Sequence, residues 1–331
     1  MQLGLVIDPR LDRSWEDALE LAVGNAITHV EPCGGGHVPK AYVDPIALAS
    51  DDDALAAFRE SVSSRGLTIA ALGCYGNPIH PDEQRARAAH EDFVAMCAVA
   101  SKLDVKRVTV ISGVAAGGPH DRAPNWIIPS IYADLEKAYR WQWEERLIPY
   151  WREACTVAAA HDVTICMEPI GGFMVYNGQT FLRLREACGE TLCANVDPSH
   201  LWWMGIDPLL FVEQLQGAVG YAHAKDVALD PGGVARDGVA PACAYDDWDA
   251  RTWTYRAIGF GHPESFWKDF FTKLRRGGYD DVVSIEIEES FMTTDEALDK
   301  SVELVRRALP REPIPASNWF DKYEWASASV E

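Results

Sequence analysis

The segment Leu192-Cys-Ala-Asn-Val-Asp197-Pro-Ser-His200 is a short apolar run that ends in an acidic side chain, with a histidine three residues later. Three other such runs in the second half of the chain end in a polar residue, and these residues are Glu168, His223 and Glu286. In a parallel barrel the reactive side chains lie at the carboxyl ends of the strands. We therefore expect the four run ends to meet at one mouth of a barrel.

Eight strand-like runs alternate with helix-like segments over almost the whole chain. The strand-like runs cover residues 3–7, 28–31, 67–72, 107–111, 163–168, 192–197, 219–223 and 282–287. Helical spacing is found over residues 15–23, 52–64, 89–102, 133–160, 180–187, 208–215, 263–274 and 295–308. This alternation indicates a parallel sheet, and eight such units predict a single closed (β/α)8 TIM barrel. A doubly wound open sheet would need a Gly-rich turn after an early strand, and Ile7-Asp8-Pro9-Arg10 has none.

The length of 331 residues fits one barrel with long loops, because such barrels typically take about 250 residues before insertions. We expect the catalytic barrel domain over residues 1–310. The loops over residues 113–130 and 224–261 should lie on the catalytic face and shape access to the site. Residues 311–331 form an extension that is too aromatic for a disordered terminus, so we expect it to pack on the barrel or on a partner subunit.

Charge and composition argue against several classes of function. The net charge of −20 repels phosphate backbones and anionic membranes, so neither nucleic acid nor a membrane is expected as a partner. No apolar run approaches the ~20 residues that span a bilayer. The N-terminus lacks the basic region of a signal peptide. The eight cysteines include no CxxC pair. From these observations together we expect a cytoplasmic globular protein.

Three carboxylates and one imidazole at equivalent strand ends form a ligand set for one hard divalent cation. One strand-end carboxylate is usually a cap or an ion-pair partner, and the shared position of all four points to a metal. We expect Mn²⁺, with Mg²⁺, Co²⁺ or Zn²⁺ as alternatives. Glu288 shares a strand face with Glu286, while Glu289 is expected at a solvated strand end. The predicted ligands are Glu168, Asp197, His223 and Glu286.

Other polar side chains lie close to these run ends in sequence. His200 is either a cap of the turn after Asp197 or a contact to a substrate hydroxyl or carbonyl. Lys225 shares a face with His223 and either holds an oxyanion or pairs with a carboxylate. The same alternatives apply to Arg256. We take His200, Lys225 and Arg256 as candidates for substrate binding.

Four longer motifs link the chain to a known group of proteins. They are Asn195-Val-Asp197-Pro-Ser-His200-Leu, His223-Ala-Lys225-Asp226, Gly259-Phe-Gly-His262 and Gly278-Tyr-Asp-Asp-Val-Val-Ser-Ile-Glu286. With them the chain resembles the xylose-isomerase-like sugar isomerase/epimerase superfamily of TIM barrels, from about residue 3 to about residue 309. The motifs are specific for the superfamily and say little about the substrate.

The resemblance implies one divalent metal on Glu168, Asp197, His223 and Glu286. It also implies that the two glutamates move a proton on and off a carbon next to a sugar carbonyl, while the metal holds the enediolate oxygen. His200 would contact substrate oxygens. The chemistry of the residues agrees, because a weakly acidic α-proton needs a placed base and a cation at the developing oxyanion. We therefore expect a metal-dependent sugar isomerase or epimerase.

Two features depart from that superfamily. Ile170 stands where relatives often have a histidine, and the loop Gly117-Gly-Pro-His120-Asp121 contains a histidine that can act as an additional catalytic base. In this loop histidine and in its aromatic extension, the chain resembles one branch of the superfamily. In that branch a barrel subunit, paired with a small β-sandwich subunit, deglycosylates 3-oxo-C-glycosides. There, proton abstraction is followed by β-elimination of the aglycone. This carbon–carbon lyase activity is the alternative function.

Two further classes fit the sequence less well. Abasic-site endonucleases share the fold, but they need several metals, more His ligands and a basic rim, against nine His and a charge of −20 here. A metal-free sugar-binding protein or scaffold would not need all four ligand positions. Barrels of this kind often self-associate, so we expect a homo-oligomer whose small-molecule partner is a sugar or glycoside.

Overall fold

A parallel sheet closes on itself at the centre of the molecule, in a computed structural model that describes residues 1–129 and 131–314. The strand order is β1-β11-β8-β7-β6-β5-β4-β2-β3, and β1 also pairs with β2, which closes the barrel. The closed barrel confirms the predicted (β/α)8 fold. Its strands are β1 (Gln2–Ile7), β2 (His29–Gly36), β3 (Thr68–Ile69), β4 (Leu72–Tyr75), β5 (Arg107–Ile111), β6 (Thr164–Glu168), β7 (Leu192–Val196), β8 (Val219–Ala224) and β11 (Val282–Ile285).

The third strand position of the barrel is interrupted. Both β3 and β4 pair with β2, so together they occupy the place of one strand that the sequence predicted as continuous. Ala70 and Ala71 separate the two pieces. The barrel therefore has eight strand positions among the described residues, although the sheet contains nine strands.

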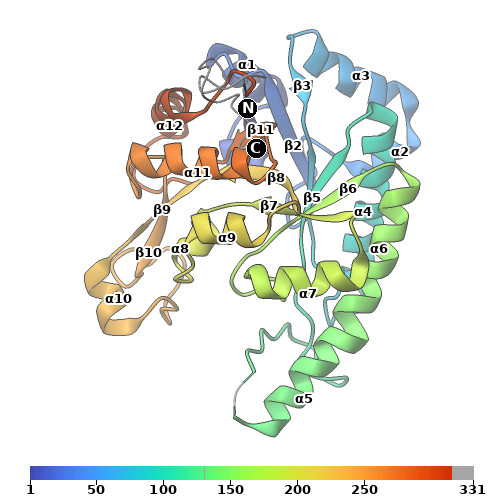
Figure 1. Cartoon of the computed structure of the whole chain (residues 1–331). Coiled ribbons are helices and arrows are strands. Elements are labelled where there is room, and N and C mark those ends of the chain that lie inside the picture. The colour runs from blue at the N-terminus through green and yellow to red at the C-terminus, as the bar shows by residue number, and fades with distance from the viewer. Residues whose placement is uncertain (130, 315–331) are drawn as a thin grey trace, which may run out of the picture.

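Helices surround the strands on the outside of the barrel (Figure 1). Several begin at a side-chain cap, for example Ser14, Asp51, Asp82 and Thr293, each of which accepts a hydrogen bond from a backbone N–H of the first turn. The helices that match predicted segments are α1 (Trp15–Gly24), α3 (Asp52–Ser63), α4 (Glu83–Leu103), α7 (Gly178–Cys188), α9 (Pro208–Gln214), α11 (Glu264–Arg276) and α12 (Thr294–Ala308).

The predicted helix over residues 133–160 consists of three consecutive pieces. They are α5 (Ala133–Trp141), a π-helical segment η2 (Gln142–Leu147) and α6 (Ile148–Ala160). The π-helical segment and α6 bury Trp143 and Trp151, whereas α5 has no buried residue. Figure 1 shows α5 extending away from the barrel.

The segment after β8 is more ordered than the long loop that the sequence predicted over residues 224–261. It contains an antiparallel pair, β9 (Asp226–Leu229) and β10 (Trp253–Arg256), with α10 (Pro231–Asp237) between them. Three other short helical elements were also not predicted. They are η1 (Pro9–Leu11), α2 (Pro45–Ser50) and α8 (Ser199–Trp202).

Two predictions concern the ends and surface of the chain. Most of the aromatic extension, residues 315–331, lies outside the described residues, and the boundary predicted at residue 310 stays a prediction. Within the part of the chain that the structure describes, no helix is both long and apolar enough to cross a membrane.

Candidate metal centre

The four residues predicted as metal ligands meet at the carboxyl-terminal mouth of the barrel. Glu168 is the last residue of β6, His223 lies in β8, and Asp197 and Glu286 directly follow β7 and β11. Each offers one ligand atom, and these atoms all lie within 4.8 Å of one another. All four residues are buried. We call this set the acidic cluster.

The acidic cluster suits a divalent cation because one of its buried carboxylate oxygens forms no hydrogen bond. Asp197 Oδ1 accepts a hydrogen bond from the backbone N–H of Ser199 at 2.8 Å. Its Oδ2 is buried and has no hydrogen-bond partner among the described residues. Lys225 Nζ and His200 Nε2 lie 3.5 Å from this oxygen, and a bound cation would satisfy it more directly. Carboxylate oxygens with one imidazole suit hard or borderline divalent ions.

Glu31, a residue that the sequence analysis did not select, orients the histidine of the cluster. Its Oε2 lies 2.8 Å from His223 Nε2, and its Oε1 accepts a hydrogen bond from Thr109 at 2.7 Å. Nε2–H of His223 is thus assigned as donor to Glu31. The other nitrogen, Nδ1, lies 3.4 Å from Glu168 Oε2 and 3.3 Å from Glu286 Oε2. Nδ1 is therefore the ring atom that faces the centre of the cluster.

Lys225 is buried among the carboxylates. Its Nζ lies 3.1 Å from Glu286 Oε2 and 3.5 Å from Asp197 Oδ2, and the side chain is 2% exposed. Burial by itself would lower the pKa of Lys225, but Glu286, Glu288 and Asp197 raise that pKa well above its ordinary value. The ammonium group therefore stays charged and offsets part of the negative charge of the cluster.

Arg10 is a second cation at the cluster that sequence reasoning missed. Its Nη2 lies 2.7 Å from Glu286 Oε1, its Nη1 pairs with Glu288, and its Nε donates to Asp8 at 2.8 Å. Burial would raise the pKa of Glu286, but Lys225 and Arg10 outweigh burial and hold that pKa well below its usual range.

Glu168 has a different electrostatic environment from Glu286. Burial raises the pKa of Glu168, with the opposing charges of His223 and Lys225 offsetting part of the shift. Its Oε2 accepts a hydrogen bond from Asn195 at 2.9 Å. Both glutamates of the cluster are buried, but only Glu286 also pairs with Arg10, so burial prevails at Glu168 and the cations prevail at Glu286.

His200 bridges the cluster to the wall of the mouth. Its Nε2 lies 2.7 Å from Glu168 Oε1, and its Nδ1 lies 2.8 Å from the hydroxyl of Tyr255. Burial and the charge of Lys225 lower the pKa of His200 to about 4, so the ring is neutral near pH 7. Tyr255, which the sequence analysis did not select, is brought here by the β9–β10 pair.

Two predicted site residues lie outside this network. Arg256 Nε is 3.1 Å from both carboxylate oxygens of Glu289. The Glu289 side chain is only 1% exposed, so the expectation that Glu289 lies at a solvated strand end is wrong. Glu289 is buried because its carboxylate pairs with Arg256 and accepts a hydrogen bond from the backbone N–H of Ala257. His120 is exposed on the loop after β5 and, among the described residues, takes no part in the polar contacts of the cluster.

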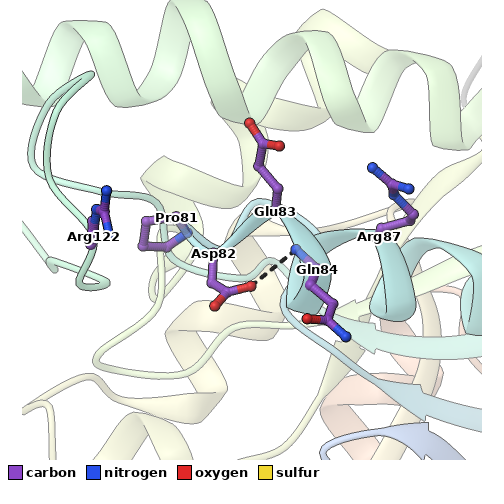
Figure 2. Close-up of a pocket in the computed structure, with 6 residues that line it drawn as sticks. All are labelled: Pro81, Asp82, Glu83, Gln84, Arg87 and Arg122. Atoms are coloured by element: carbon purple, nitrogen blue, oxygen red, sulfur yellow. Dashed lines mark hydrogen bonds between the residues drawn. The ribbon is translucent and has the colours of Figure 1, made fainter.

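A cavity of about 420 Å³ opens beside the acidic cluster. Its lining includes Arg10, Tyr245, Tyr255 and Glu288. Arg10 pairs with Glu286 of the cluster and with Glu288, and the hydroxyl of Tyr255 contacts His200. A different cavity, of about 590 Å³, lies between the start of α4 and Arg122 (Figure 2). No described residue in its lining pairs with the cluster, whereas Arg10 of the first cavity pairs with Glu286, so the first cavity is the candidate substrate site.

Comparison with known proteins places the chain among similar barrels. The model of the family described as xylose isomerase-like TIM barrel matches residues 21–308. The uncharacterized protein YfiH of Bacillus subtilis (strain 168) is 34% identical over 316 residues, which cover 93% of this chain and 99% of that protein.

Solved structures share the fold at lower identity. The 3-keto-D-glucoside 4-epimerase YcjR from E. coli is 14% identical, with a TM-score of 0.62 over 93% of this chain and 99% of its own. The IolI protein, in a structure with a bound zinc atom, is 17% identical, with a TM-score of 0.62 over 94% of this chain and 100% of its own.

Proposed function

The chain belongs to the xylose isomerase-like TIM barrel family, and on that premise we propose that it is a divalent-metal-dependent sugar isomerase or epimerase that moves a proton on a carbon next to a carbonyl. The observation that carries this proposal is the buried acidic cluster beside a cavity. Its two glutamates come from β6 and β11, which are separated in the sheet by β7 and β8. They therefore approach a bound substrate from different parts of the mouth.

The metal would be held by Glu168, Asp197, His223 and Glu286. When bound, a divalent cation supplies Lewis-acid stabilisation of negative charge that develops on a substrate oxygen. We propose Mn²⁺ as the resident ion. Zn²⁺ is the alternative, because the structure of IolI contains zinc and the ligand types suit both ions.

The residues of the chain divide the proton transfer between them. In our proposal one glutamate, Glu168 or Glu286, removes the proton and the other returns one to the same or the neighbouring carbon. Neutral His200 and charged Lys225 contact substrate oxygens next to the reacting carbon. The burial of these groups limits the access of water to them.

The other predicted groups have more distant roles in the proposal. Arg256 would contact the substrate from beside the cavity, which its partner Glu289 lines. His120 would act as an additional base if its loop closes over the mouth. We further propose that the protein assembles as a homo-oligomer.

The alternative function is elimination from a 3-oxo-C-glycoside. It is favoured by the similarity in fold to YcjR, which acts as an epimerase on a 3-keto-glucoside. The same proton abstraction next to a 3-oxo group leads to epimerisation if the proton returns, and to loss of the aglycone if a leaving group is present in the β position. In this alternative the barrel would be the catalytic subunit, with a small β-sandwich subunit as its partner.

Solvent-deuterium incorporation tests both functions. The protein is loaded with Mn²⁺ and incubated in D₂O with a panel of ketoses and 3-oxo-glycosides, and products are read by mass spectrometry. Label in a recovered ketose or its epimer supports the isomerase. A released aglycone supports the lyase.

Two variants make this experiment specific to the cluster. Asp197→Asn and Glu286→Gln should lose both bound metal and exchange, because each removes an anionic ligand. Asp280→Asn is the control, since Asp280 pairs with the N-terminal ammonium and with Arg275 and lines neither cavity at the mouth. The proposal is wrong if the two cluster variants keep both metal and exchange.

A further inference from the structure

A second polar cavity lies at the same mouth of the barrel, between the ends of β2 and β4 and the side of α4. Its volume is about 310 Å³. Because Gly36 ends β2 and Asn77 follows β4, the cavity opens at the carboxyl ends of the strands, as the acidic cluster does. We call it the His37–Arg85 cavity. Its lining includes Gly36, His37, Asn77, His80, Arg85 and Asp92.

Three basic side chains of this cavity form no ion pair with the carboxylate in its lining, and the charges of two of them, Arg85 and His80, act instead on Asp82 at the start of α4. Arg85 and His37 form no ion pair among the residues that the structure describes. His80 Nδ1 accepts a hydrogen bond from the backbone N–H of Asp82 at 2.9 Å, which leaves Nε2 as the ring nitrogen that carries a proton and donates. The three groups are also close to one another, since burial and then the charges of His80 and Arg85 lower the pKa of His37.

The carboxylate in the lining does not neutralise these groups. Asp92 Oδ1 lies 2.5 Å from Lys40 Nζ, and its Oδ2 accepts a hydrogen bond from the backbone N–H of Gly36 at 3.0 Å. The nearby carboxylate of Asp82 caps α4 through the backbone N–H groups of Gln84 and Arg85.

We propose that the His37–Arg85 cavity binds a small oxyanion, a phosphate or carboxylate group. Arg85 would supply the fork of guanidinium donors that matches such a group, and His80 Nε2 would donate a further hydrogen bond. This inference rests on the proposed function where it names the anion as a substituent of the sugar substrate. A free anion of the same chemistry is the other source.

Tyr75 connects the cavity to the acidic cluster. Its carbonyl oxygen accepts a hydrogen bond from the backbone N–H of His37 at 2.6 Å. Its hydroxyl lies 3.3 Å from Glu168 Oε2. Tyr75 thus joins the backbone beside His37 to a ligand of the cluster, and in our proposal a sugar over the cluster directs a charged substituent toward Arg85.

Titration with inorganic phosphate, followed by calorimetry, tests the site itself. We expect Arg85→Gln to weaken phosphate binding at least about tenfold, because a charge-assisted pair is lost. Arg87→Gln is the matched control. It removes the same charge two residues further along α4, but Arg87 lines the other cavity, where Asp82 and Glu83 lie between it and Arg122 (Figure 2). We expect less than about a twofold change for this variant.

His80→Gln should weaken phosphate binding in the same direction as Arg85→Gln. The proposal is overturned if phosphate does not bind, or if Arg85→Gln and Arg87→Gln weaken it equally. An equal effect would mean that only the general charge of the surface matters. Phosphate bound at a metal would be insensitive to Arg85→Gln and would also overturn it.

The source of the anion is decided by the deuterium-exchange assay with paired phosphorylated and unphosphorylated ketoses. A phosphorylated substrate whose preference disappears in Arg85→Gln supports an anionic substituent. If the protein does not prefer the phosphorylated ketose, while phosphate binding still depends on Arg85, the result supports a free anion at the same site. Absence of exchange with every sugar while phosphate still binds would count against the proposed function and leave the anion site supported.

Discussion

At the scale of single residues, Glu31 determines which nitrogen of His223 can reach a metal. Its carboxylate holds Nε2 at 2.8 Å and so turns Nδ1 toward Glu168 and Glu286. We predict that Glu31→Gln lowers the affinity for Mn²⁺ about 10–100-fold, as expected when the partner that orients a ligating imidazole is weakened. Titration of the metal-free protein, followed by calorimetry, measures this change.

The control for Glu31→Gln is Asp92→Asn. Both replace a buried carboxylate by its amide, but Asp92 pairs with Lys40 and not with a cluster residue. Asp92→Asn should lower thermal stability and leave the Mn²⁺ affinity within about twofold of wild type. Equal metal affinity in Glu31→Gln and wild type would show that Glu31 does not orient the ligand.

Lys225 would compete with the proposed cation for the same carboxylates, since its Nζ approaches both Glu286 and Asp197. In the metal-free protein, Lys225→Met leaves buried carboxylates with less compensation, which typically costs about 3–5 kcal/mol. We therefore predict a lower melting temperature without metal and a larger increase on adding Mn²⁺ than in wild type. If Lys225 also contacts substrate, kcat/KM falls by about 100-fold while metal stays bound.

Lys268→Met serves as the control for this variant, because Lys268 is half-exposed and pairs with Glu264 on the surface of α11. It should change neither the metal-induced shift nor turnover. A Lys225→Met protein that keeps full activity would make Lys225 a structural counter-ion, the other interpretation that the sequence left open.

At the scale of elements, Gly34 in β2 allows the following chain to cross the strand closely. A Cβ atom at this position would overlap the carbonyl oxygen of Val43 in the segment before α2. We predict that Gly34→Ala destabilises the protein by about 2 kcal/mol or more, because backbone has to shift. Gly24→Ala is the control: nothing lies within 4 Å of its Cβ, and it ends α1.

Denaturant unfolding of both glycine variants measures the effect. Gly24→Ala should be neutral or raise the free energy of unfolding by up to about 1 kcal/mol, through higher helix propensity and a more restricted unfolded chain. A Gly34→Ala protein as stable as wild type would show that β2 and the segment before α2 do not pack as described.

The elements differ in how far the sequence can predict them. β5 has the predicted limits, because an apolar run bounded by polar residues defines it. β2 runs on past the predicted end at Glu31 to Gly36, since the barrel supplies strand partners that Pro32 and three glycines would not suggest. The same rule that selected Glu168 would have selected Glu31. Tyr255 has no such signal, because only the β9–β10 pairing brings it to His200.

At the scale of the whole molecule, the closed sheet forces like charges together. Strands β6, β7, β8 and β11 are neighbours in the barrel, so acidic groups from segments far apart in sequence meet in a space of a few ångströms. The protein already carries a net charge of −20, which adds to the repulsion. Lys225 and Arg10 oppose this repulsion, and the proposed cation would add to them.

A metal that binds the folded chain should therefore raise the stability of the whole barrel. At an excess of about a thousand times the Kd, binding to the native state contributes about 4 kcal/mol. For a chain of this size we take roughly 2 °C per kcal/mol, so removal of the metal with a chelator should lower the melting temperature by about 8 °C. Asp197→Asn should show almost no difference with and without Mn²⁺, while Asp92→Asn keeps the full shift. The same shift in Asp197→Asn and wild type would place the stabilising ion elsewhere on the acidic surface and separate metal stabilisation from the cluster.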